Sequence, residues 1–119
     1  MTSQTEIETL LVERLKTRAQ FLACARGRSV SKGAVVVQIL PHEGQEAIRA
    51  GFTATRKIGN AVVRNRAKRR LREAARLLLP LHGVRGRDYV FIARGGTATR
   101  PWARLLDDVK SALISVAPD

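Results

Sequence analysis

Nine cationic side chains are concentrated in residues 56–76, and their type and spacing point to contact with a polyanion. The segment reads RKIGNAVVRNRAKRRLREAAR, and its single acid, Glu73, leaves it with +8 of the formal net charge of +12. On a helix with about 100° per residue, an arc of about 80° holds the apolar residues Val63, Ala67, Leu71, Ala74 and Leu78. The opposite side holds Arg64, Asn65, Lys68, Arg69, Arg72 and Arg76.

This predicted helix carries a ladder of like charges at i,i+4 spacing along residues 64–76. Such pairs repel by a few tenths of a kcal/mol each, and a bound polyanion would neutralise them. The ordinary explanation of a charge run is a solvated face kept for solubility. Here the run is dense, of one sign and confined to one helix face in a chain of pI ≈ 11.5, which favours a nucleic-acid surface.

Composition predicts one globular domain in a reducing, cytoplasmic setting. The chain has 119 residues, of which 45% are hydrophobic and 27% charged. The single Cys24 excludes an internal disulfide and a multi-cysteine zinc site. No apolar run approaches the ~18–20 residues that span a membrane, and the apolar arc lacks the aromatic anchors of a membrane-surface helix.

The sequence offers little catalytic chemistry. His42 and His82 lie in separate predicted loops without a cysteine or carboxylate at ligand spacing. The ten acids form no motif, and a two-metal nuclease needs several carboxylates at one site. We therefore predict no catalytic residue and no metal site, and a protein that binds rather than reacts.

The elements that must position the cationic helix follow from periodicity and turn residues. Residues 1–13 are predicted to be a loosely ordered acidic extension, and residues 14–119 a single RNA-binding domain. Thr17 is predicted to cap a helix at 18–25 that Gly27 ends, and Asn60 to cap a helix at 61–79 that stops before Pro80. Strands are predicted at 34–40, 47–55 and 88–93, with an edge strand at 26–32 and a last helix after Pro101. The order α-(β)-β-β-α-β-α indicates helices packed on one mixed sheet.

The motif KIGNAV at residues 57–62, followed by RNR at 64–66, Lys68-Arg69 and Arg72-Glu73, strongly resembles the bacterial ribonuclease P protein component. The resemblance extends over about residues 14–117. It implies an α+β fold, an αβββαβα two-layer sandwich whose mixed sheet contains a left-handed β-α-β crossover, as in a domain of a small-subunit ribosomal protein.

The resemblance also implies an activity and partners. The chain would be the protein subunit of an endoribonuclease in which a catalytic RNA, with Mg²⁺ held mainly by that RNA, removes the 5′ leader of precursor tRNA. The protein would bind the RNA and the leader without supplying the catalytic centre, and would need no obligate protein partner and no membrane.

Carried over residue by residue, the RNA-binding positions are Arg56, Lys57, Asn60, Arg64, Asn65, Arg66, Lys68, Arg69 and Arg72. Phe21 and Gln38 are assigned to a leader-binding cleft, where Phe21 either stacks on a base or packs in the core. Positions at which the family often has further aromatic residues carry Ala25, Val35 and Gln38, which predicts weaker stacking.

Two other functions fit parts of the pattern. A general RNA-binding or ribosomal protein of the same fold is the alternative that composition alone permits. A DNA-binding regulator is disfavoured, because nearly every exposed side chain of the helix suits a phosphate and few can read base edges.

Overall fold

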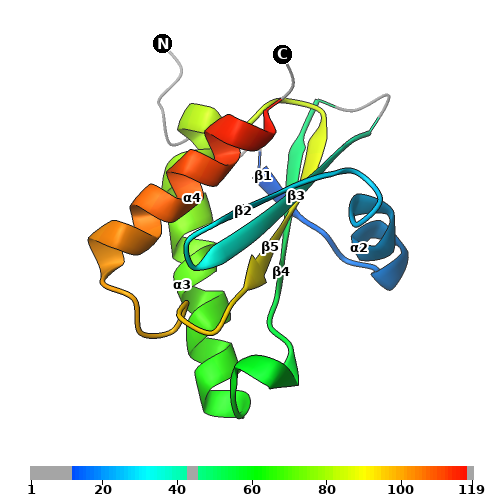
Figure 1. The fold of residues 1–119 in the computed structure, drawn as a ribbon. Coiled ribbons are helices and arrows are strands. Elements are labelled where there is room, and N and C mark those ends of the chain that lie inside the picture. Colours follow the sequence, from blue (N-terminus) through cyan, green and yellow to red (C-terminus); the bar gives the residue numbers. More distant parts are fainter. Residues whose placement is uncertain (1–11, 43–45, 118–119) are drawn as a thin grey trace.

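The computed structural model describes residues 12–42 and 46–117, which form a mixed sheet with helices on both faces (Figure 1). In chain order the elements are β1 (Val12–Arg14), α2 (Arg18–Cys24), β2 (Arg28–Lys32), β3 (Val35–Pro41), β4 (Ile48–Thr53), the short 3-10 helix η1 (Arg56–Ile58), α3 (Ala61–His82), β5 (Arg87–Ala93) and α4 (Trp102–Val116). The predicted α+β class, the order of the elements from α2 onward and the edge position of β2 are confirmed.

Five strands of the described chain make one sheet in the order β1-β4-β5-β3-β2. β1, β4 and β5 run parallel to one another, whereas β3 is antiparallel to β5 and β2. Helix α3 connects β4 to its parallel neighbour β5, so the cationic helix is the crossover of a β-α-β unit.

Alternation along the strands divides the core into two parts. On one face, α3 and α4 pack on a large cluster that includes the fully buried side chains Val37, Phe91 and Leu105. On the other face, α2 covers a small cluster built on Leu15, Cys24 and Val90. The sheet therefore has one face covered by two long helices and one face covered by a single short helix.

Helix α3 runs through Pro80 to His82, so the predicted end before Pro80 is wrong. Proline removes one backbone N–H, and in the last turn this costs a single intrahelical hydrogen bond. Leu79 is completely buried, and its carbonyl accepts a 2.7 Å hydrogen bond from the N–H of Gly83. Packing and this terminal bond hold the last turn in place.

The sheet begins inside the segment that was predicted to be an extension. Val12–Arg14 pairs in parallel with residues 48–50 of β4, so the boundary after residue 13 is placed too late. Residues 1–11 of the predicted extension lie outside the described residues. No described helix combines the length and apolar character that crossing a bilayer requires.

Candidate nucleic-acid interface

The N-terminal end of α3 is fixed by its cap and by the glycine before it. Asn60 is extended, and its side-chain oxygen accepts a 3.0 Å hydrogen bond from the N–H of Val63, as predicted. Gly59 has φ of 146°, a conformation that residues with a side chain rarely adopt. The RNR residues therefore occupy a defined place near the start of α3, a few residues after η1, which carries the exposed Arg56 and Lys57.

One side of α3 is packed against the protein. The predicted apolar residues Ala67, Leu71 and Ala74 are fully buried. Ala75 and Leu79 lie outside the predicted arc and are buried as well. Because α3 contacts α4 in addition to β4 and β5, its buried side is wider than a single arc.

The other side of α3 presents the predicted cations to solvent. Arg64 and Lys68 are partly buried, and the exposed members are Asn65, Arg66, Arg69 and Arg72. Within the described residues, the acid pairing on this helix is between Glu73 and Arg76, 2.7 Å apart, and it lowers the pKa of Glu73. No described acid forms an ion pair with the arginines and lysine at 64, 66, 68, 69 and 72. This face therefore carries uncompensated positive charge.

Two arginines of α3 have aromatic neighbours. The guanidinium of Arg72 lies 5.6 Å from the ring centre of Phe52. Arg70, which was not predicted as a site residue, turns toward α4. It donates hydrogen bonds to the carbonyls of Thr97 and Arg100 and lies 5.7 Å from the ring centre of Trp102. Arg70 thus joins α3 to the turn before α4 and is not part of the exposed face.

The predicted cleft residues Phe21 and Gln38 lie on the α2 side of the sheet. Phe21 is half-buried and packs on the small cluster, where a Cβ atom at Gly51 would lie 2.5 Å from its ring. Gln38 is also half-buried, and its backbone carbonyl lies 3.5 Å from the sulfur of Cys24. The placement of Val35 in the cleft is wrong, because Val35 is fully buried on the opposite face with α3 and α4. Its neighbour Val36 belongs to the cleft side.

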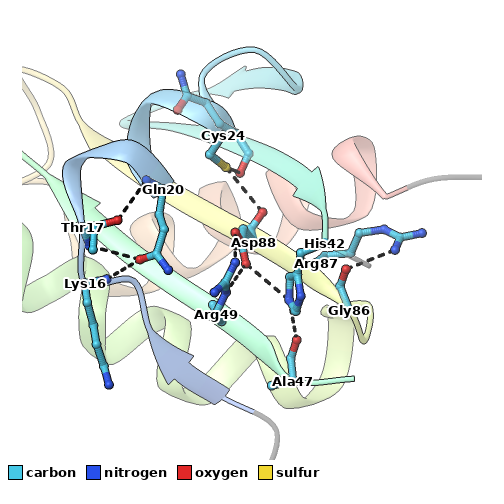
Figure 2. Close-up of polar contacts among 11 residues, drawn as sticks. Lys16, Thr17, Gln20, Cys24, His42, Ala47, Arg49, Gly86, Arg87 and Asp88 are labelled. Atoms are coloured by element: carbon cyan, nitrogen blue, oxygen red, sulfur yellow. Dashed lines mark hydrogen bonds and ion pairs between the residues drawn. The ribbon is translucent and has the colours of Figure 1, made fainter. Parts of the chain in front are cut away.

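A buried polar cluster at the base of this side was missed by the sequence reasoning (Figure 2). Asp88 is 3% exposed and accepts two 2.7 Å hydrogen bonds from Arg49. His42 Nε2 lies 3.3 Å from the same carboxylate and 2.9 Å from the carbonyl of Ala47. The sequence contained one signal for this cluster: Arg49 and Asp88 place opposite charges at interior positions of β4 and β5.

This cluster affects ionisation nearby. The hydrogen bond to Asp88 raises the pKa of Arg49 above its ordinary value. Burial, reinforced by the charge of Asp88, raises the pKa of the Cys24 thiol to about 12. Cys24 is therefore a buried, protonated thiol that contacts the backbone carbonyls of Gln38 and Asp88.

The donor set for metals is poor in the part of the chain that the structure describes. It contains no group of three or more His, Cys, Asp or Glu side chains that could hold an ion. Asp88 is itself occupied by Arg49 and His42.

Comparisons with known proteins agree with this architecture. A family model described as Ribonuclease P matches residues 12–117. The ribonuclease P protein component of Caulobacter vibrioides is 62% identical over 112 residues, which cover 93% of this chain and 75% of that protein. The corresponding protein of Ruegeria pomeroyi is 54% identical over 102 residues, covering 83% of this chain and 82% of that protein.

Solved structures show the same fold. The RNase P protein from Thermotoga maritima superimposes with a TM-score of 0.76 at 27% identity, covering 89% of this chain and 99% of that one. The Staphylococcus aureus RNase P protein gives a TM-score of 0.72 at 28% identity, covering 84% and 91%. With the family model spanning nearly all of the described residues, the chain belongs to the ribonuclease P protein family.

Proposed function

We propose that this chain binds the RNA subunit of ribonuclease P through the exposed cationic face of α3 and η1. The observation that carries the proposal is the absence of a described acidic partner for the arginines and lysine at 64, 66, 68, 69 and 72. Arginine side chains present planar forks that match phosphate, and Asn65 can donate and accept together. The full proposed surface consists of Arg56, Lys57, Asn60, Arg64, Asn65, Arg66, Lys68, Arg69 and Arg72. Asn60 also caps α3.

The substrate proposed for the complex is precursor tRNA, whose 5′ leader is removed. Phe21 and Gln38 lie on the face that α2 covers only in part, and both side chains remain partly accessible. We assign the leader strand to this face, with weak stacking because Ala25 and Gln38 stand where the family often has aromatic residues. Since relatives are named as ribonuclease P components, this role is favoured over general RNA binding.

The proposed division of labour leaves the bond-breaking chemistry to the RNA. Mg²⁺ bound mainly by that RNA would activate water for hydrolysis of the phosphodiester. The residues of this chain would bind phosphates, orient the leader and reduce repulsion between RNA strands. We place this complex in the cytoplasm, without an obligate protein partner.

Reconstitution tests the proposal. Precursor tRNA is incubated at low Mg²⁺ with the ribonuclease P RNA alone, the chain alone, and both together. We expect no cleavage by the chain alone and faster cleavage by the RNA when the chain is added. Cleavage by the chain without RNA, or a complete lack of stimulation, would contradict the proposal.

A further inference from the structure

A second basic site lies at the end of the sheet where α4 finishes. A hollow of about 430 Å³ is lined by Arg26, Gly27, Arg28, Ile39, Pro41, Arg87 and Val116. In Figure 1 the C-terminal end of α4 lies at the top of the view, whereas α3 begins at the bottom. This hollow is therefore remote from the RNR residues and does not share a residue with the surface proposed above.

The backbone brings its three arginines together. A Cβ atom at Gly27 would lie only 2.1 Å from the carbonyl oxygen of Ile39, so the turn after α2 rests directly on β3. Arg26 and Arg28 flank that glycine. Arg87 belongs to β5, which lies on the other side of β3 from β2, and it pairs in register with Pro41 of β3. Two segments that are far apart in the sequence thus direct three arginines to one place.

The charge of the hollow is of a single sign. None of its lining residues is acidic, and no described acid pairs with Arg26, Arg28 or Arg87. Arg28 donates a 3.2 Å hydrogen bond to the carbonyl of Ala117 at the end of α4. Arg87 donates one 3.3 Å bond to the neighbouring carbonyl of Gly86, which leaves most of its five donors available (Figure 2).

The lining also has an apolar part. Ile39 and Val116 are buried members of the main core, and the exposed Pro41 beside them supplies the accessible apolar surface at the rim. A simple inorganic anion would use only the guanidinium groups. A nucleotide would use both parts, with its phosphate on the arginine forks and its ribose or base against the exposed ring of Pro41.

We propose that this hollow is a second RNA-binding site that takes one phosphodiester segment through Arg26 and Arg87, with Arg28 holding the end of α4. The proposal rests on the ribonucleoprotein role proposed above and extends it. It makes the chain bivalent toward RNA, with contacts at both ends of the sheet. The segment comes either from the RNA subunit or from precursor tRNA, which share this chemistry.

Arginine footprinting tests the site directly. The full chain is treated with an arginine-specific glyoxal reagent, alone, with the RNA subunit, or with precursor tRNA, and modification at each arginine is measured by mass spectrometry. We expect protection of Arg26 and Arg87 in at least one RNA arm, and that arm identifies the source of the segment. Protection of Arg66 and Arg69 without protection of Arg26 and Arg87 would overturn the second site alone. Protection at neither place would defeat the proposed function as well.

A charge-matched pair of variants tests its contribution to binding. Arg26→Gln with Arg87→Gln removes two charges from the hollow, and Arg104→Gln with Lys110→Gln removes two exposed charges from α4. We expect the first variant to lower the slope of log affinity against log salt by roughly 1.5, as for two phosphate contacts. The second variant should leave the slope close to that of the unmodified chain. If the two variants had equal slopes, the change would follow from net charge alone, and the second site would be overturned.

Discussion

Arg66 and Arg70 stand one helical turn apart on α3, yet their surroundings differ completely. Arg66 is exposed and has no described acidic partner, whereas Arg70 donates to two carbonyls and lies over Trp102. The helix geometry contained this signal. At about 100° per residue, Arg70 falls roughly 20° outside the apolar arc, on the side of Val63. A count of charges treats the two arginines alike, and their angular positions separate them.

The two arginines should respond differently to removal. We expect Arg70→Ala to lower the free energy of unfolding by roughly 1–3 kcal/mol, because two carbonyls lose a charged donor. Arg66→Ala should change it by less than about 0.5 kcal/mol, as for an exposed side chain. Denaturant unfolding of both variants measures this difference. Equal losses of stability would contradict the division of α3 into an exposed face and an anchoring arginine.

Cys24 gives a prediction about pH. Its pKa is raised from 9.0 to about 12 in the folded protein, so above pH 9 the unfolded chain loses a proton that the native state retains. The contribution of Cys24 to stability is fully present below pH 9 and is lost as the pH rises toward 12. We expect unfolding experiments between pH 8 and 11 to show a steeper loss for the native chain than for Cys24→Ala. Parallel curves would mean that the thiol is not buried as described.

At the scale of elements, α2 is short and depends on its cap. Thr17 and Gln20 form a capping box, in which each side chain accepts a hydrogen bond from the backbone of the other. The same helix carries Phe21, which packs on the sheet at Gly51.

We expect Thr17→Ala to cost about 1 kcal/mol of stability. Amide hydrogen exchange measures this loss locally, and in the Thr17→Ala variant we expect the amides of α2 to exchange faster than those of α3. A matched control is Thr99→Ala, at an exposed position away from α2. If exchange in α2 were unchanged, the cap would not be what holds this helix on the sheet.

Periodicity and turn residues were sufficient to predict the helices, the main strands and both helix N-caps. The failures have physical causes. Pro80 ends a helix only when its missing N–H costs more than packing supplies, and the burial of Leu79 reverses that balance. Val35 was placed on the wrong face because the register of β3 is set by the turn before it. That turn is a two-residue connection, since Lys32 of β2 pairs with Val35 of β3. Asp88 was missed because its partners come from β4 and from the loop after β3.

At the scale of the whole molecule, positive charge distinguishes the proposed RNA-binding surface on α3 from the face that carries Phe21 and Gln38. The sheet supplies a rigid frame, and α3 crosses it between parallel neighbours β4 and β5. The exposed cations then act together on a long polyanion, and their combined effect depends on ionic strength. The RNA-binding residues themselves were identified from the KIGNAV and RNR motifs, and their role stays a prediction, because a fold without its RNA shows exposure and charge only.

Salt dependence follows from this collective effect. With about 6–10 phosphate contacts, we expect affinity for the RNA subunit to fall by roughly 10³–10⁵ between 50 and 200 mM salt. Filter binding or fluorescence anisotropy over that range gives the slope. A shallow slope, equivalent to one or two contacts, would show that the cationic face of α3 does not bind the phosphate backbone.

The most direct measurement of the central claim is the affinity of the double variant Arg64→Ala, Arg66→Ala for the RNA subunit, together with its melting temperature. The exposed face of α3 predicts at least a roughly 10-fold loss of affinity, about 1.4 kcal/mol, with a nearly unchanged melting temperature. Unchanged affinity, or a loss of affinity that is accompanied by a large drop in melting temperature, would contradict it.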